Sequence, residues 1–269
     1  MSHSSAGESR IPSTEIDRVR SLLLFDRSLS HAAQQDRIPD PLPDGPIPLS
    51  LADSGGSLSN NMPSLRLVGF DEAGRGALAG PVTVACVSFE LSRWLSPTGD
   101  LRNTTLETFA DLNDSKRVAE QVRERLYHRI LANARWGIGY ASAVEIDRLG
   151  IVQACRIAAL RGYRCLGIGL DHRLSADLGL FDRGLTLGEG EGSESMPVSI
   201  QLTRGDARSF HIAAASILAK VSRDAIMRKL GKRAAVYGFA GHKGYGTAAH
   251  RAAIGEYGPS RFHRRTFLH

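Results

Sequence analysis

Four acidic residues follow short apolar segments of this sequence, and their side chains could carry out chemistry. Asp71 and Glu72 are adjacent and follow a short apolar lead-in, while Asp171 and Asp206 each follow a later apolar run. Functional groups in α/β proteins usually lie at strand ends and in the loops that follow them. We therefore expect the four carboxylates to share one site.

Carboxylates gathered in one place repel each other, so at least one must take up a proton unless cations neutralise them. An all-oxygen site suits the hard ions Mg²⁺ and Mn²⁺ rather than zinc. With two such ions, one can activate water while the other stabilises the leaving oxygen of a phosphodiester. The acids thus favour metal-dependent hydrolysis. The alternative for Asp71 and Glu72 is a turn with two solvated acids.

The bend after these two acids is expected to be glycine-rich. Adjacent side chains on a straight strand face opposite sides, so Asp71 and Glu72 are expected to share a site only where the strand ends. Gly69, Gly74 and Gly76 make such a bend cheap, because glycine accepts backbone angles that other residues avoid.

The chain is expected to fold as one mixed α/β sheet with helices. Residues 68–89 predict a hairpin around the glycine-rich turn. The remaining expected elements are a helix at 13–35, a helix at 112–134, a strand at 136–143, a helix at 144–163, a strand at 165–170 that delivers Asp171, a strand at 198–202 and a helix at 208–230. Residues 90–112 are interpreted as irregular and 175–196 as an inserted surface loop.

Residues 1–62 are interpreted as an N-terminal extension and residues 63–269 as the catalytic domain. The extension is expected to hold a disordered tail, one helix and a linker rich in Pro, Gly and Ser. No chemistry is recognisable there, so deletion of residues 1–60 is expected to spare activity.

Charge and composition limit the classes of molecule that the protein can bind and the classes of function that it can have. The net charge is +6, and residues 204–269 hold 13 Lys or Arg against 3 acids, a net of +10. A basic region of this kind suits phosphate binding. No apolar run is long enough to cross a membrane. The three cysteines lack metal-ligand spacing and indicate free thiols in a reducing cytoplasm. The absence of a Walker A sequence disfavours nucleotide triphosphate hydrolysis.

The string VGFDEAGRGALAGP at 68–81 resembles the signature of the type 2 ribonucleases H, the ribonuclease HII family. The resemblance continues in family order to the C-terminus. Its further blocks are LNDSK at 112–116, EIDRLGI at 145–151, RGDAR at 204–208, AAASILAKVSRD at 213–224, HKGYGT at 242–247 and HRRTF at 263–267.

The resemblance implies a ribonuclease H-like mixed five-stranded sheet flanked by helices, with a helical C-terminal portion. It implies that Asp71, Glu72, Asp171 and Asp206 hold two Mn²⁺ or Mg²⁺ ions, with Asp71 best placed to touch both. This chain departs from the family by lacking Gly after Asp171, so Asp177 and Asp182 remain rivals for the third position.

Substrate contacts are also implied. The turn Gly74, Arg75 and Gly76 would present backbone groups to the 2′-hydroxyl at an RNA–DNA junction, the group that distinguishes RNA from DNA. Tyr245 would pack on the neighbouring sugar. Lys116 would contact phosphate, although a solvated lysine fits equally well. Asp224 is interpreted as a structural ion-pair partner of Lys220 rather than a metal ligand.

The resulting prediction is a monomeric cytoplasmic endoribonuclease that acts on RNA–DNA hybrids and on duplex DNA carrying single ribonucleotides. It would cut on the 5′ side of a ribonucleotide and leave a 3′-hydroxyl and a 5′-phosphate, in ribonucleotide excision repair and DNA replication. Two alternatives remain open: a structure-specific DNA nuclease of the same architecture, and a catalytically inactive nucleic-acid-binding module.

Overall fold

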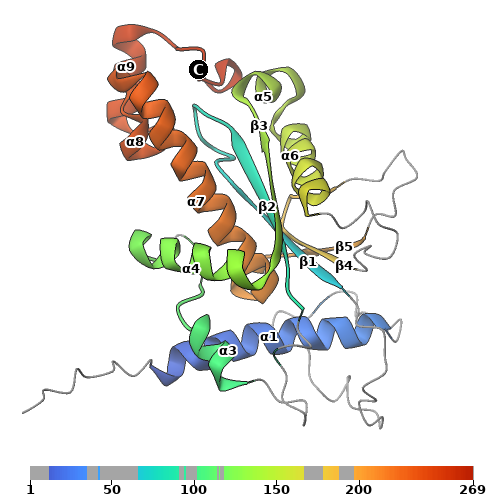
Figure 1. Ribbon diagram of the computed structural model, residues 1–269. Helices are drawn as coiled ribbons and strands as arrows, with labels where there is room; N and C mark the ends of the chain where they lie inside the picture. Colours follow the sequence, from blue (N-terminus) through green and yellow to red (C-terminus); the bar gives the residue numbers. More distant parts are fainter. Residues whose placement is uncertain are drawn as a thin grey trace, which may run out of the picture.

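The computed structural model describes residues 12–34, 42, 66–90, 94, 102–113, 115, 118–166, 178–187 and 197–268. At its centre is a five-stranded mixed sheet in the order β3-β2-β1-β4-β5, which confirms the expected fold class (Figure 1). No helix among these residues has the length and apolar character needed to span a membrane.

The predicted hairpin forms the middle of the sheet. Strand β1 (Leu67–Ala73) pairs antiparallel with β2 (Val82–Ser88), which pairs antiparallel with β3 (Arg135–Ala141). On its other side β1 pairs parallel with β4 (Leu178–Asp182), and β4 pairs parallel with β5 (Val198–Leu202). All seven residues of β2 are buried, as expected for an apolar run covered on both faces.

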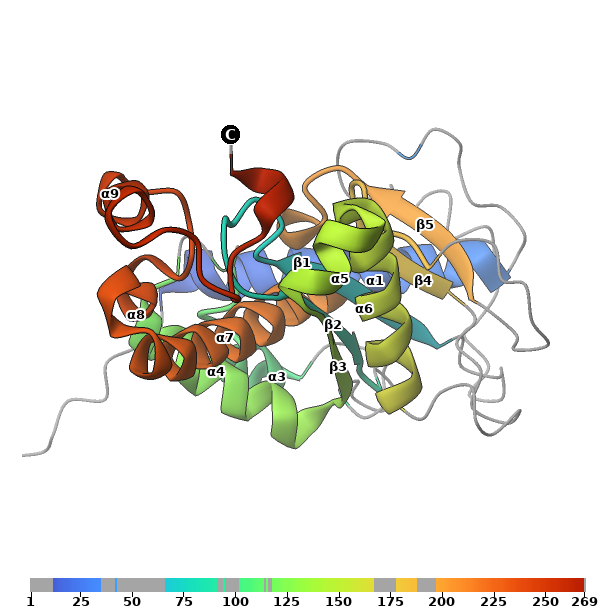
Figure 2. The ribbon, with the colours of Figure 1, turned by 90° about the horizontal axis from the view of Figure 1, so that it is seen from above.

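Helices cover both faces of the sheet. Helix α7 (Phe210–Arg233) lies across one face, and α5 (Ala143–Leu149) and α6 (Ile151–Cys165) lie on the other (Figure 2). Helix α7 approaches β1 closely at Gly69, where a Cβ atom would stand 2.3 Å from the carbonyl carbon of His211. Glycine at this position therefore allows the contact between helix and strand.

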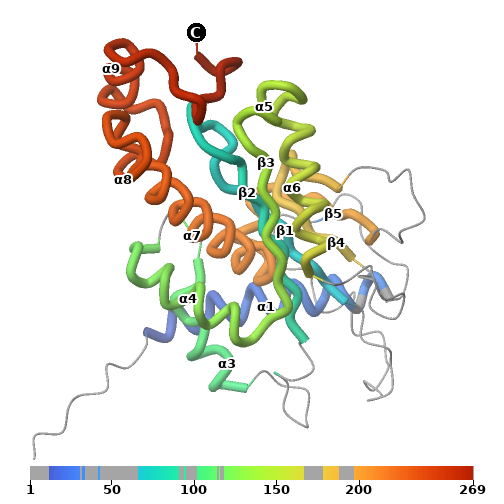
Figure 3. Tube along the Cα trace, turned by 45° about the horizontal axis from the view of Figure 1, so that its top comes forward, coloured from blue at the N-terminus to red at the C-terminus, as the bar shows by residue number. Residues whose placement is uncertain are grey.

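Two helical predictions need correction. The helix expected at 112–134 is α4 (Glu120–Asn133), which begins eight residues later, and α3 (Asn103–Thr108) lies in the region expected to be irregular. The helix expected at 144–163 is two helices, α5 and α6, separated at Gly150, whose φ of 77° breaks the regular path. The short helices α8 (Phe239–His242) and α9 (Ala248–Tyr257) follow α7 near the β1–β2 turn (Figure 3).

Helix α1 (Ser13–Gln34) is part of the hydrophobic core. Val19 and Leu23 are buried in the cluster that contains the first turns of α7. Phe25 and Leu29 are buried in a second cluster with residues of β4 and β5. The helix predicted at 13–35 is confirmed. That deletion of residues 1–60 spares activity stays a prediction, and the packing of α1 argues against it.

A buried polar contact reinforces this packing. The Asp26 carboxylate accepts a hydrogen bond at 3.0 Å from the backbone N–H of His211, and Asp26 Oδ2 lies 2.7 Å from His211 Nδ1. The Phe89 backbone N–H donates to His211 Nε2 at 3.2 Å, so Nδ1 of a neutral His211 carries the proton and donates to Asp26. Asp26 thus caps the first turn of α7 from outside that helix.

Candidate active site

Parallel pairing brings two carboxylates to the same edge of the sheet. The register between β1 and β4 ends with Phe70 opposite Phe181. The next residue on each strand is an acid, Asp71 on β1 and Asp182 on β4. The carboxyl ends of parallel strands lie at one edge, which places these two side by side.

A third acid comes from the turn before α7. Asp206 lies in a short 3₁₀ turn, Gly205–Ala207, between β5 and α7. The backbone N–H of the neighbouring Gly205 donates to Asp182 Oδ1 at 2.8 Å. This hydrogen bond joins the Asp206 turn to the end of β4.

The electrostatics of Asp71 show that the acids act on each other. Burial raises its pKa well above the usual range, and the negative charges of Glu72, Asp182 and Asp206 raise it further. The backbone N–H of Glu72, which donates to Asp71 Oδ1 at 2.8 Å, opposes this shift. Asp71 is therefore the carboxyl group around which the other three are arranged.

The strand that pairs with β1 differs from the sequence-based expectation. Cys165, expected to open a strand, is the last residue of α6, and the strand next to β1 is 178–182. The loop predicted at 175–196 thus contains β4. Asp171 and Asp177 lie outside the described residues. The residue that ends the strand beside Asp71 is Asp182.

Glu72 stays within β1, contrary to the expectation that the strand ends at the two acids. Its partner across the hairpin is Val84, whereas Asp71 is opposite Ala85. The two side chains leave the strand in opposite directions, yet the charge of Glu72 raises the pKa of Asp71, so the two acids interact without the expected strand end. Arg75 Nη1 lies 3.4 Å from Glu72 Oε1 and donates to the carbonyl oxygen of Gly184 at 3.1 Å. Arg75 thereby links the β1–β2 turn to the loop after β4.

The bend itself begins at Gly74, with a φ of 89°. A Cβ atom there would lie 1.8 Å from Nε of Arg223, so both the backbone angle and the space require glycine. Buried Arg264 donates to the carbonyl oxygens of Gly74 at 2.7 Å and Arg75 at 2.9 Å. The Arg264 guanidinium group therefore fixes the backbone of this turn.

Arg223 holds the other end of the same turn. It donates to the carbonyl oxygens of Pro81 at 3.0 Å and Ala79 at 3.2 Å. Burial lowers the pKa of Arg223, and burial together with Arg223 lowers that of Arg264 to about 10. Both lie in sequence blocks that were recognised, but sequence reasoning missed their role, because burial of an arginine against carbonyl oxygens leaves no composition signal.

Tyr245 lies in a loop beside this turn. Its ring is about two-fifths exposed, and the Arg223 guanidinium stands over it at 5.3 Å from the ring centroid. The carbonyl oxygen of Gly244 accepts hydrogen bonds from the N–H groups of Leu78 at 2.8 Å and Ala79 at 3.3 Å. The loop that carries Tyr245 and the glycine-rich turn are thus one hydrogen-bonded unit.

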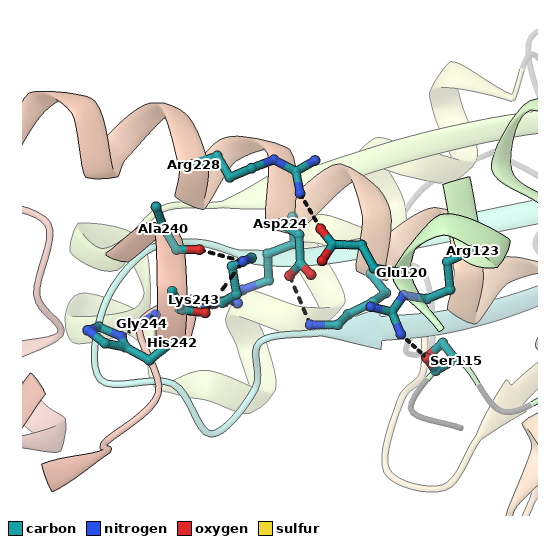
Figure 4. A network of polar contacts seen from close by, with 12 residues as sticks. Ser115, Glu120, Arg123, Asp224, Arg228, Ala240, His242, Lys243 and Gly244 are labelled. Carbon is teal, nitrogen blue, oxygen red and sulfur yellow. Dashed lines mark hydrogen bonds and ion pairs between the residues drawn. The ribbon is translucent and has the colours of Figure 1, made fainter. Parts of the chain in front are cut away.

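Two further predicted residues lie elsewhere. Lys116 is outside the described residues. Asp224 accepts from Lys220 Nζ at 2.9 Å, which confirms a structural ion pair on α7. Figure 4 shows Asp224 in a surface network that includes the Arg228–Glu120 pair at 2.9 Å.

The donor set fits hard divalent cations. Within the described ranges no three His, Cys, Asp or Glu side chains converge into a closed metal-ligand group. The negative charges of Glu72, Asp182 and Asp206 nevertheless raise the pKa of Asp71, a repulsion that a bound cation would relieve. Their oxygens suit Mg²⁺ or Mn²⁺.

A mixed sheet with acids clustered at one edge, next to a rigid turn and an aromatic loop, defines a metal-dependent nuclease of ribonuclease H-like architecture. The family model "Ribonuclease HII" matches residues 68–269. The chain belongs to the ribonuclease HII family, and it is an endoribonuclease. The activity of this family is cleavage of RNA in RNA–DNA hybrids and at ribonucleotides embedded in DNA.

Curated relatives support this assignment over most of their length. Ribonuclease HII of Syntrophotalea carbinolica is 43% identical over 206 residues, which cover 75% of this chain and 85% of the relative. Ribonuclease HII of Chloroflexus aurantiacus is 41% identical over 202 residues, with the same shares. The matched region begins after α1, so the helix that carries Asp26 lies outside the family model.

Solved structures share the fold. A chain of the PCNA:RNase HII complex from Archaeoglobus fulgidus superposes with a TM-score of 0.56 at 20% identity, covering 76% of this chain and 96% of that chain. Ribonuclease H2 from Pyrococcus horikoshii gives a TM-score of 0.52 at 20% identity, covering 75% and 93%.

Proposed function

We propose that Asp71, Glu72, Asp182 and Asp206 hold two Mn²⁺ or Mg²⁺ ions, and that the site hydrolyses the phosphodiester on the 5′ side of a ribonucleotide. The observation that carries this proposal is the parallel register that sets Asp71 beside Asp182, whose carboxylate is hydrogen-bonded to the turn that contains Asp206. Asp182 takes the third position in place of Asp171, because it ends the strand paired with β1.

Bound ions would activate a water molecule and stabilise the negative charge on the leaving oxygen. The hydrolysis would produce a 3′-hydroxyl and a 5′-phosphate. The chain's own contribution is to fix the ligands. Asp71 sits on the central strand, held by the Glu72 N–H, while the Gly205 N–H fixes the Asp182 carboxylate. Ligands on paired strands and on a short 3₁₀ turn before α7 would keep their separation when the ions bind.

Recognition of the ribonucleotide is assigned to the turn Gly74, Arg75 and Gly76 together with Tyr245. Arg264 occupies carbonyl oxygens on one side of the turn and thereby fixes its shape. A rigid backbone can test for a 2′-hydroxyl because a deoxyribose offers no partner there. The exposed face of Tyr245 can pack against the adjacent sugar.

Phosphate contacts are assigned to the basic C-terminal quarter and to Lys116. Residues 204–269 carry a net charge of +10, which favours a nucleic-acid backbone. We also propose that the protein acts as a monomer in the cytoplasm. The three cysteines are free thiols, as a reducing compartment keeps them.

The test uses a labelled DNA duplex that carries one ribonucleotide, with an all-DNA duplex as control. Wild type with Mn²⁺ or Mg²⁺ should cut only the first duplex, on the 5′ side of the ribonucleotide, and a chelator should abolish the cut. Binding of the duplex without any cut would instead support an inactive binding module. Cleavage of the all-DNA duplex would support a DNA nuclease.

A further inference from the structure

A row of buried histidines lies directly behind the loop that carries Tyr245. His250 on α9 is fully buried and His263 is 2% exposed. Their Nε2 atoms lie 3.0 Å apart, and the His250 ring stacks on His242 with centroids 4.3 Å apart. Phe239 contacts all three rings, and the proposed mechanism gives none of these histidines a role.

The hydrogen bonds fix which nitrogen of each ring carries the proton. The backbone N–H of Ser260 can only donate, and it points at His263 Nδ1 at 2.9 Å. A neutral His263 is therefore protonated on Nε2, which donates to Nε2 of His250. His250 must then carry its proton on Nδ1, which lies 2.9 Å from the carbonyl oxygen of Tyr245. These hydrogen bonds form a chain, here called the histidine relay, in which each group donates to the next from Ser260 through His263 and His250 to Tyr245.

His242 fits the same arrangement from the other side of His250. The Gly244 N–H donates to His242 Nδ1 at 3.1 Å, as Figure 4 shows from close by, so His242 Nε2 donates to the carbonyl oxygen of Tyr237 at 2.6 Å. Burial lowers the pKa of His250, and burial followed by the charge of His250 lowers that of His263 to about 4. Both shifts favour the neutral rings at pH 7, at which the relay keeps its direction.

The end of the relay is the backbone of the residue proposed to sense the sugar. The Tyr245 carbonyl oxygen accepts from the Thr247 N–H at 2.8 Å inside the loop and from His250 outside it. The contact from His250 ties the loop to α9, while Gly244 ties it to the glycine-rich turn through Leu78. Losing one tie leaves the Tyr245 ring free to tilt away from Arg223.

We propose that His250 and His263 are positioning residues for ribonucleotide recognition, acting through the carbonyl group of Tyr245. This inference rests on the proposed function of Tyr245 at the sugar beside the ribonucleotide. It makes these two histidines part of substrate selection although both are buried.

The experiment compares His250→Phe with His250→Asn. Phenylalanine keeps a ring of similar size but loses both hydrogen bonds. Asparagine places an amide N–H near the position of Nδ1 and so can still donate to Tyr245. We expect kcat/KM on a duplex with one ribonucleotide to fall roughly tenfold in His250→Phe. In His250→Asn it should fall clearly less, because this variant keeps the hydrogen bond to Tyr245 and loses only the one to His263.

Coupling to Tyr245 separates positioning from general destabilisation. Adding His250→Phe to Tyr245→Ala should change kcat/KM no further, because the relay acts through the side chain already removed. Phe239→Leu is the control, since it loosens the same cluster without removing a relay hydrogen bond, and it should keep wild-type kcat/KM. His263→Asn offers a second break in the relay if His250→Phe does not fold.

Independent, multiplying losses in the double variant, or wild-type kcat/KM in both His250→Phe and His263→Asn, would overturn the inference. Failure of the proposed function looks different. In that case wild type itself would leave the ribonucleotide-containing duplex uncut. A wild type that cuts, with Tyr245→Ala as active as wild type, would overturn only the route through Tyr245.

Discussion

At the residue scale, Asp71 holds its carboxyl group where burial and three neighbouring acids oppose its charge. Such an arrangement is unfavourable without cations and becomes favourable with them. Activity and stability therefore make opposite demands on this residue, as is common at functional sites.

The residue-scale prediction concerns Asp71→Asn. In a chelator at pH 8 this variant should unfold at a higher temperature than wild type, because it removes a buried charge and its repulsions. Addition of Mn²⁺ should raise the Tm of wild type by several degrees and that of the variant less, because ligands stabilise the state that binds them. Equal shifts with Mn²⁺ would contradict a role for Asp71 in metal binding.

His263 gives a pH prediction. Its folded-state pKa of about 4 lies below the ordinary value of 6.5, so the unfolded state binds more protons between these values. Its contribution to stability, about 3 kcal/mol at most, is complete above pH 6.5 and is lost as the pH falls toward 4. His263→Asn should therefore flatten the loss of Tm between pH 6.5 and 4 relative to wild type. Parallel curves would contradict the burial of a neutral His263.

At the element scale, the start of α7 depends on a helix from outside the family model. Asp26 on α1 caps the first turn of α7 through His211, and Asp206 lies in the turn just before that helix. Whether a domain boundary falls near residue 63 stays a prediction, because residues 43–65 lie outside the described part. The packing of α1 against the core does not depend on where that boundary lies.

The element-scale prediction compares two acids of α1. Asp26→Ala should lower Tm by roughly 5 to 10 °C, since it leaves two buried donors of His211 without their carboxylate acceptor, a loss of about 3 kcal/mol. Asp17→Ala is the matched control, because Asp17 is mostly exposed and pairs with Arg20 at 3.5 Å. Deletion of residues 1–34 should destabilise the protein further. A truncated protein with wild-type Tm and cleavage would contradict a structural role for α1.

At the scale of the whole molecule, the central features follow from sequence patterns. The hairpin, β3, β5, α1 and α7 lie close to where periodicity and turn residues placed them, because each has an apolar pattern of sufficient length. The charge of Asp206 acts on Asp71, and the loop of Tyr245 is hydrogen-bonded to the glycine-rich turn. The roles that the resemblance implies for these residues stay predictions.

The predictions that the structure corrects depended on short apolar runs or on tertiary contacts. The run at 165–170 and the strand at 178–182 are both short and apolar, and such runs do not distinguish a helix end from a buried strand. Cys165 continues α6, and the pairing with β1 falls to the later run. The burial of Arg264 and of Asp26 could not be predicted, because each depends on a partner far away in the sequence.

The most direct test of the proposed metal site is cleavage of the single-ribonucleotide duplex by Asp182→Asn and Asp171→Asn beside wild type. Both variants replace one carboxylate by its amide, so each controls for the other. If Asp182 is the third acid, Asp182→Asn should lose at least about a hundredfold in kcat with Mn²⁺ or Mg²⁺, while Asp171→Asn should cut like wild type. Full activity in Asp182→Asn together with loss in Asp171→Asn would contradict the site built on β4.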